Sequence, residues 1–271
     1  MKEFNEYIIA NEPIIRLSFF VSILLLMSLF EYIIPKKELL LSKFKRWSNN
    51  ISIIVVNSFL LKFIFASSII TISIYTTENK IGLLNLFEIS FFFSVILSII
   101  LLDLIIYFQH RLFHKIDFFW KFHKVHHSDM DFDVTTGLRF HPIEIIISML
   151  IKMISVFIIG VPIIAIVIFE IILSSLSMFN HSNIKLPAIL DKRLRYFIVT
   201  PDMHRIHHSI HNEELNSNYG FNISLWDRIF SSYTNKPKNG YEKMTIGLKE
   251  FYDENKTVSI LNILSLPFRK K

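Results

Sequence analysis

The chain has 271 residues, of which 52% are hydrophobic and 27 are Phe, and its mean hydropathy is +0.44. It contains no cysteine, which excludes disulfides, iron–sulfur clusters and thiolate metal sites. The net charge of +6 is modest, and the basic residues stand beside apolar runs. We therefore expect them to meet phospholipid headgroups, and we expect no nucleic-acid partner.

Three long apolar segments come first, at residues 14–34, 51–75 and 82–108. Each exceeds the roughly 20 residues with which a helix crosses a ~30 Å hydrocarbon core. The alternative is a set of buried helices in a soluble protein, but three such runs in succession leave little amphipathic surface. We interpret all three as membrane helices, the first as a retained anchor, and expect Asp103 to reach the interface near the end of the third.

A fourth apolar region, residues 143–179, is 37 residues long and contains Gly160 and Pro162. One helix of that length would measure roughly 55 Å, which is too long for a single crossing, and glycine with proline favours a break. We expect two short helices in a hairpin. The predicted fold is an all-α polytopic membrane protein with about four transmembrane helices, the last two forming this hairpin, and a helical, histidine-rich cytoplasmic cap.

Basic residues predict the orientation. The loop after the first run contains five of them, at Lys36, Lys37, Lys43, Lys45 and Arg46, whereas the next loop contains one lysine. The positive-inside rule places the first loop in the cytoplasm, and the third run then ends there too. With the high Ile, Asn, Lys and Phe usage, we expect a multi-pass protein of a bacterial inner membrane with its histidines on the cytoplasmic side.

All eleven histidines lie between His110 and His211. They form one HxxxH pattern and two HxxHH patterns, whose spacing puts each set on one face of a helix. A ninth candidate ends the apolar hairpin. The candidate metal ligands are His110, His114, His123, His126, His127, His181, His204, His207 and His208.

The number of histidines points to metal. A single buried histidine is usually satisfied by one hydrogen bond, but eight or nine that converge repel one another when protonated. Neutral imidazole binds zinc, copper, iron or nickel, and one ion takes four to six ligands, so this set implies two ions. We expect His141 to support the ligands by hydrogen bonding and His211 to be a surface residue.

The chain resembles the fatty acid hydroxylase and sterol desaturase superfamily, in particular its bacterial sterol-desaturase-like members. The resemblance rests on the motifs HRLFH, HKVHH and HRIHH and on TPDMHRIHHS before NYGFNISLWDRIFSSY. The resemblance covers roughly residues 95–234. It implies an integral membrane oxygenase in which the nine histidines hold two irons. With O₂, such an enzyme hydroxylates or desaturates a sterol, fatty acyl, alkylglycerol or carotenoid-like lipid. Ser177 stands where the family often has a further histidine, which leaves a gap for water or Asn180.

The resemblance also implies a division of the chain and a partner. We expect membrane helices over 1–95, the catalytic domain over 96–235 and a cytoplasmic tail over 236–271. The sequence has no nucleotide fingerprint and no haem-binding HPGG word, so electrons must come from a separate cytochrome, ferredoxin or reductase.

Two other functions stay open. Histidine-rich transition-metal transporters or sensors place ligands near the bilayer midplane, which differs from histidines beyond a helix end among basic residues. A catalytically inactive lipid-binding relative is the third interpretation. Among the acids, we interpret Asp129, Asp131 and Asp133 as a solvated loop. Asp202 and Arg205, beside the last motif, either orient ligands or serve as cap and surface residues.

Overall fold

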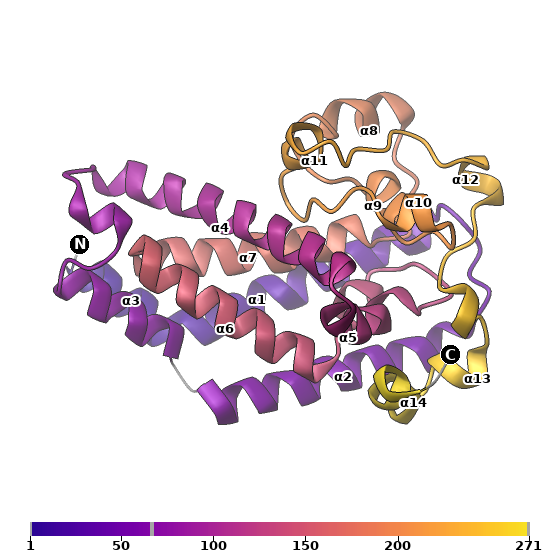
Figure 1. The fold of residues 1–271 in the computed structure, drawn as a ribbon, viewed down its shortest axis with the longest axis horizontal. Coiled ribbons are helices and arrows are strands. Elements are labelled where there is room, and N and C mark those ends of the chain that lie inside the picture. Colours follow the sequence, from indigo (N-terminus) through magenta and orange to yellow (C-terminus); the bar gives the residue numbers. More distant parts are fainter. Residues whose placement is uncertain (1, 66–67, 270–271) are drawn as a thin grey trace.

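The protein is an elongated bundle of helices with its histidine-rich part at one end. The structure is a computed structural model that describes residues 2–65 and 68–269. In Figure 1 the long helices run side by side along the long axis, and the short C-terminal helices gather at the end opposite the N-terminus. The described residues form helices and three isolated bridges but no extended strand, so the predicted all-α class is confirmed.

The long helices are α1 (Lys2–Ile33), α2 (Lys43–Phe65), α3 (Ser68–Glu78), α4 (Phe91–Lys115), α5 (Asp117–His127), α6 (Pro142–Ile159) and α7 (Ile163–Asn180). The short α-helices are α8 (Ala188–Leu194), α9 (Pro201–His207), α10 (Asn212–Leu215), α11 (Leu225–Ile229), α12 (Gly240–Lys243), α13 (Glu254–Thr257) and α14 (Ile260–Ser265). Single 3₁₀ turns lie at η1 (Leu83–Leu86), η2 (Thr136–Leu138), η3 (Lys249–Phe251) and η4 (Leu266–Phe268).

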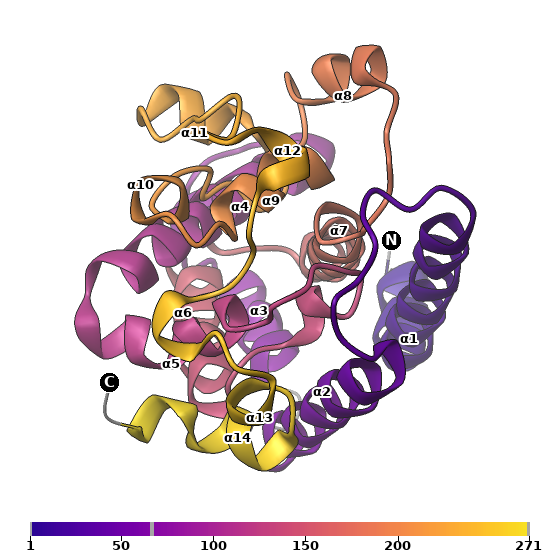
Figure 2. The same cartoon turned by 90° about the vertical axis from the view of Figure 1, so that its right-hand side faces the viewer.

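Within the described ranges, five helices are long and apolar enough to cross a membrane: Glu6–Ile33, Lys43–Phe65, Phe91–Lys115, Pro142–Ile159 and Ile163–Asn180. The hairpin α6–α7 is central, because α1, α3 and α4 pack on α7 and α2, α3 and α4 pack on α6. Figure 2 shows this arrangement end-on, with α1 and α2 on one side. Each hairpin helix has 18 residues and thus a length of about 27 Å, close to the thickness of the hydrocarbon core.

The hairpin break lies where glycine and proline predicted it. Gly160 ends α6 in the left-handed region at φ 74°, and Pro162 precedes the first turn of α7. Gly82 lies directly against this turn, since a Cβ on Gly82 would stand 2.4 Å from the Gly160 nitrogen. Both glycines are needed because two backbones meet there.

The second and third apolar runs differ from expectation. The run 51–75 was expected to be one helix, but it belongs to two, α2 and α3; residues 66–67 lie outside the described part. The run 82–108 begins as a 3₁₀ turn after Gly82, at φ 99°, and α4 starts only at Phe91 because Phe87 and Ser90 take extended conformations. At its other end α4 continues to Lys115.

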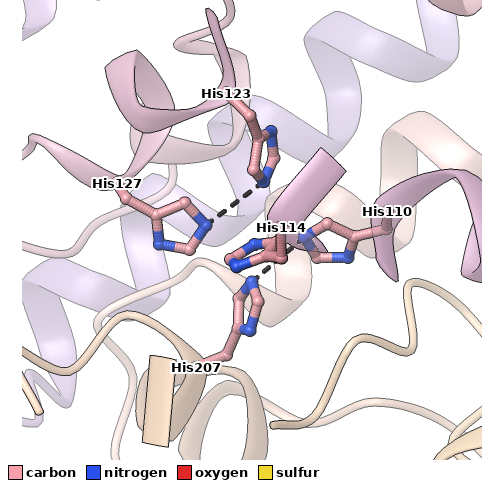
Figure 3. Close-up of side chains that lie close together, drawn as sticks. All are labelled: His110, His114, His123, His127 and His207. Atoms are coloured by element: carbon pink, nitrogen blue, oxygen red, sulfur yellow. Dashed lines mark hydrogen bonds between the residues drawn. The ribbon is translucent and has the colours of Figure 1, made fainter. Parts of the chain in front are cut away.

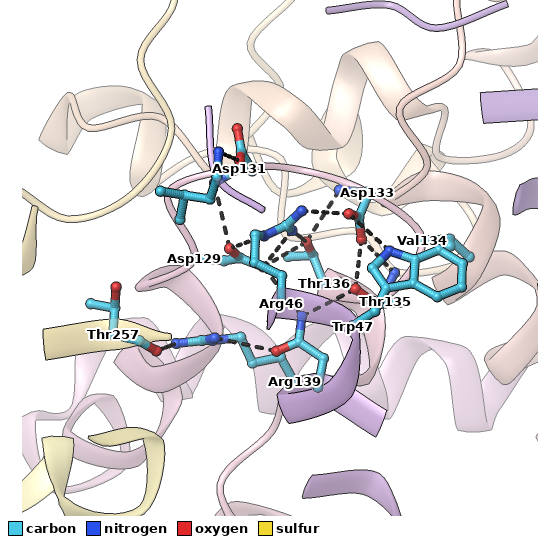
Figure 4. Close-up of polar contacts among 12 residues, drawn as sticks. Arg46, Trp47, Asp129, Asp131, Asp133, Val134, Thr135, Thr136, Arg139 and Thr257 are labelled. Atoms are coloured by element: carbon cyan, nitrogen blue, oxygen red, sulfur yellow. Dashed lines mark hydrogen bonds and ion pairs between the residues drawn. The ribbon is translucent and has the colours of Figure 1, made fainter. Parts of the chain in front are cut away.

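The acidic residues after α5 are buried, so the prediction of a solvated loop is wrong. Arg46 of α2 binds Asp129 with two nitrogens, at 2.9 and 2.8 Å, and also binds Asp133. Asp131 instead accepts from the backbone of Leu40 and Leu41. The cost of burying these carboxylates is offset because each one has a cation or amide donors (Figure 4).

Arg139 extends the same network towards the C-terminus. Its guanidinium donates to the Val125 carbonyl, to Asn50 and to the Thr257 carbonyl of α13, and the last bond is 2.6 Å long. Burial lowers the pKa of Arg139 to about 10, which leaves it charged at neutral pH. The network therefore joins α2, the loop after α5 and the C-terminal segment behind the histidines.

Asp103 does not reach the interface as expected. Its side chain is buried and accepts from Trp226 Nε1 and Asn222 Nδ2, both at 2.8 Å, and from the Ile223 backbone. The carboxylate thus attaches α11 and the segment before it to α4, which carries the first two histidines.

Candidate metal centre

Four separate segments deliver the nine candidate histidines to one place. His110 and His114 were expected beyond the end of the third apolar helix. They lie instead on the last turns of α4 itself. Ile116 takes an extended conformation between α4 and α5, and the chain there turns back to present the second motif. His181 directly follows α7, and α9 carries the last motif, with His208 at its C-cap.

The nine imidazoles form two groups, and within each the possible ligand atoms lie within 4.8 Å of one another. The first group, shown in Figure 3, contains His110, His114, His123, His127 and His207. The second contains His126, His181, His204 and His208. The groups adjoin, since the rings of His127 and His208 are stacked with their centroids 4.4 Å apart.

The site is shielded from water. Eight of the nine residues are at most 5% exposed, and both ring nitrogens of the ninth, His114, are buried. Phe140 stacks on His126 at 4.5 Å, and Trp120 lies 5.0 Å from the His114 ring. A charged ring is costly in these surroundings.

Four rings are fixed through Nδ1. His110 Nδ1 lies 2.7 Å from the Tyr219 carbonyl, His207 Nδ1 2.7 Å from the Ser217 carbonyl, and His181 Nδ1 2.8 Å from the Ser177 carbonyl. His123 Nδ1 lies 2.6 Å from Glu144 Oε1. A backbone carbonyl can only accept, so Nδ1 of His110, His181 and His207 carries the proton and Nε2 of each neutral ring is a bare lone pair; Glu144, when ionised, fixes His123 in the same way.

The contact between His110 and His207 bears most directly on whether the rings bind a cation. Their Nε2 atoms are 3.0 Å apart, and both Nδ1 atoms face backbone carbonyls. Neither neutral ring then has a proton to share, so the two lone pairs face each other without a hydrogen bond. A shared cation relieves this repulsion, because two ligands at about 2.1 Å from one metal lie about 3 Å apart at a right angle.

Protonation is the other way to relieve the repulsion, and burial opposes it. Burial lowers the pKa of His123 and of His181 to about 3. Burial, followed by the neighbouring imidazoles, lowers the pKa of His126, His127, His204, His207 and His208 well below the usual value. The rings are thus neutral at pH 7, which is the form that binds metal.

Buried ring nitrogens without a hydrogen-bond partner also indicate a metal site. Seven buried ring nitrogens lack a hydrogen-bond partner within the described ranges: both of His114, both of His208, and Nδ1 of His126, His127 and His204. Buried polar atoms are normally paired, so a group of this size indicates ligands without their ion. The two all-nitrogen groups suit two borderline transition-metal ions such as iron.

Ser177, at the position where a further histidine was considered, lies beside the second group. The Ser177 hydroxyl donates to the Gly137 carbonyl at 3.1 Å, while its own carbonyl holds His181. Asn180 donates to the Phe221 carbonyl at 2.9 Å, and its Oδ1 has no partner among the described residues.

Other residues singled out from the sequence have different roles. His141 does not contact the candidate ligands: its Nδ1 accepts from the Ile143 backbone and caps α6, and its Nε2 lies 3.3 Å from the Leu264 carbonyl. His211 lies outside both groups, with Nε2 3.0 Å from Asn239 Nδ2. Asp202 pairs with Lys36, and Arg205 stacks on Phe132 and donates to Asn183.

Sequence reasoning missed the groups that orient the rings. Glu144 follows His141 by three residues in the sequence RFHPIE (residues 139–144), and its position in the first turn of α6 points it at His123. The carbonyls of Ser217 and Tyr219 carry no sequence signal, because every residue has one. Only the turn-forming residues around Asn218, which has a positive φ of 52°, indicate that the chain bends there.

Comparison with known proteins agrees with this site. The fatty acid hydroxylase family model matches residues 95–232, a range that contains all nine histidines. An ornithine lipid hydroxylase, OlsE, of Rhizobium tropici is 29% identical over 146 residues, which cover 54% of this chain and 43% of that protein. Alkylglycerol monooxygenase of Xenopus tropicalis is 29% identical over 142 residues, or 52% of this chain and 30% of the relative.

The human alkylglycerol monooxygenase is 24% identical over 158 residues, which cover 52% of this chain and 30% of that protein. The chain thus spans less than half the length of these relatives. No solved structure matches significantly. The family match covers half of the chain and includes every candidate ligand, so the chain belongs to the fatty acid hydroxylase family and is an integral membrane protein.

Proposed function

We propose that the chain is a membrane-bound di-iron oxygenase that uses O₂ to hydroxylate or desaturate a C–H bond of a lipid. The observation that carries the proposal is the His110–His207 contact, in which two proton-free Nε2 atoms lie 3.0 Å apart in a buried site. The family, together with relatives named as lipid hydroxylases and monooxygenases, supports lipid as the substrate.

The nine histidines would hold the two irons, five in the first group and four in the second. When bound, the irons supply the redox chemistry with O₂ that removes hydrogen from an unactivated C–H bond. The chain orients the rings: Glu144 and three backbone carbonyls fix four Nδ1 atoms, which aims Nε2 inward. Aromatic residues such as Phe140 and Trp120 cover the rings and exclude water.

The proposal also includes a division of the chain into three parts and an external source of electrons. Residues 96–235 hold every ligand and form the catalytic part, 1–95 are membrane helices and 236–271 are the tail. The histidine end faces the cytoplasm, where the basic loop after α1 lies. Electrons come from a separate cytochrome, ferredoxin or reductase. A transporter fits less well, because its ligands would lie along the helices at mid-membrane and here they gather at the helix ends.

Metal content of the detergent-purified chain tests the proposal first. We expect about two irons per chain, and near-complete loss of iron in His126→Ala/His207→Ala, which removes one ligand from each group. His211→Ala is the matched control, since His211 lies outside both groups, and it should keep its iron. The iron-loaded chain should consume O₂ with a lipid and a reductant.

Two results would count against the proposal. Metal that persists in the double variant would exclude the assigned ligands. Zinc that iron cannot replace on reconstitution, with no O₂ consumption, would favour a transporter or an inactive relative.

A further inference from the structure

A second hollow in the molecule lies outside the histidine groups. A cavity of about 930 Å³ opens between α8, the loop after α1 and the segment from α11 to α12. Both views show α8 standing away from the bundle at this place (Figures 1 and 2). Its walls carry six cationic side chains and two carboxylates, namely Lys36, Lys185, Lys192, Arg195, Arg228 and Lys236 with Asp191 and Asp202.

The cations outnumber the acids that could neutralise them. Arg195 pairs with Asp191 at 2.7 Å, and Lys36 pairs with Asp202 at 2.7 Å. The remaining four, Lys185, Lys192, Arg228 and Lys236, form no salt bridge within the described ranges, although Arg228 acts electrostatically on its neighbour Asp227. This surplus of positive charge lines a concave surface, so the cavity attracts an anion.

Arg228 is already held in place. Its guanidinium lies over the ring of Tyr233, 4.1 Å from the centroid, and donates to the Ser224 carbonyl at 3.1 Å. Tyr196 covers it from another direction, at 5.6 Å. A planar guanidinium fixed in this way loses little freedom when it binds phosphate or carboxylate.

The cavity lies at the level where two candidate membrane helices end. Lys36 follows the last residue of α1 by three positions, and Lys185 follows α7 by five. Backbone hydrogen bonds join the two segments: the backbone N–H of Lys185 donates to the Ile34 carbonyl, and that of Lys36 donates to the Asn183 carbonyl, each at 2.8 Å. Residues just beyond the ends of spanning helices lie among lipid headgroups.

Exposed apolar side chains adjoin the residues that line the cavity. Ile189 is 71% exposed, Phe197 is 72% exposed and Leu190 is exposed too, while the exposed Tyr196 itself lines the cavity. Large apolar residues next to lysines are typical of segments that lie on a membrane surface, with the apolar groups in the acyl region and the cations at the headgroups. A soluble anion or an acidic protein would leave these apolar residues without a partner.

From these observations we propose that the cavity binds the anionic, phosphate-bearing headgroup of a membrane lipid. Lys185, Lys192, Lys236 and the pre-positioned Arg228 bind the phosphate, and Ile189 and Phe197 contact the acyl chains. The inference adds a lipid site to the proposed oxygenase and does not depend on the chemistry at the histidines.

Binding to the full chain in a neutral detergent tests the site without any turnover. The probes are dihexanoyl phosphatidic acid, dihexanoyl phosphatidylcholine and inorganic phosphate, titrated calorimetrically. We expect the phosphatidic acid to bind more tightly than the other two. Lys192→Gln/Lys236→Gln should weaken it roughly 30-fold, because each cation near a lipid surface contributes on the order of a factor of five.

The matched control is Lys243→Gln/Lys249→Gln, which removes the same charge from exposed lysines outside this cavity. It should bind as the unaltered chain does, and both double variants should keep their melting temperature and iron. The proposal is overturned if inorganic phosphate binds as tightly as the lipid, if both double variants lose binding equally, or if no probe binds.

Discussion

Two buried polar clusters lie side by side in this protein, and they differ in whether their atoms are satisfied. The Arg46–Asp129–Asp133 cluster with Arg139 has a partner for every side-chain nitrogen and oxygen of those four residues (Figure 4). Seven buried ring nitrogens of the histidine cluster have no such partner among the described residues, and those of His114 and His127 belong to the group drawn in Figure 3.

The difference separates structure from chemistry. Burial alone does not mark a functional site, because both clusters are almost fully buried. A cluster that satisfies itself fixes the fold, whereas one that cannot satisfy itself needs a ligand. Substitutions in the two should therefore have different consequences: the first should change stability, and the second should change metal content.

Arg46→Ala should give the largest effect on stability. It leaves Asp129 and Asp133 buried without their cation, which costs about 3–5 kcal/mol in the free energy of unfolding. Thermal melting of the purified chain measures the change. Lys45→Ala is the neighbouring control: its pair with Glu254 is exposed, so the loss should stay below about 1 kcal/mol. Equal effects of the two would show that the cluster is not structural.

Glu144→Ala should give an intermediate effect, which we expect on the affinity for metal and not on stability. The carboxylate orients His123, and loss of such a partner lowers metal affinity about 10- to 100-fold. Competition with a chelator measures the affinity. Glu144→Gln keeps an acceptor for His123 Nδ1 and should retain most of the affinity. If Gln and Ala behave alike, the role of Glu144 lies in its charge and not in orientation.

His141→Ala should give the smallest effect. The ring caps α6 by accepting from the Ile143 backbone, and loss of a cap costs about 1 kcal/mol. Iron content should not change, because His141 contacts no candidate ligand. His141→Asn restores a capping acceptor and should recover the stability. A loss of iron in His141→Ala would return this residue to the site.

The sequence predicted the parts of the site that follow from helical periodicity. The i, i+3, i+4 spacing of His123 and its neighbours implies one helical face, and Gly160 with Pro162 implies the hairpin that brings His181 back. These are local signals, readable within a few turns of chain.

The remaining features depend on distant partners. Asp129 is buried because Arg46, 83 residues earlier, supplies its charge, and neither residue signals the other in a single sequence. Glu144 was missed for the same reason, since its partner His123 lies 21 positions away. The start of α4 was misplaced because the hydropathy of residues 82–90 does not reveal that Phe87 and Ser90 are extended.

The short helix α9 contributes to both histidine groups, His207 to the first and His204 to the second, with His208 at its cap. This has a consequence for how the protein is made. Synthesis proceeds from the N-terminus, so neither group is complete until α9 has left the ribosome and docked. Under the proposed function, loading of metal is thus a late step of biogenesis, and a chain that stops before residue 204 lacks ligands of both groups.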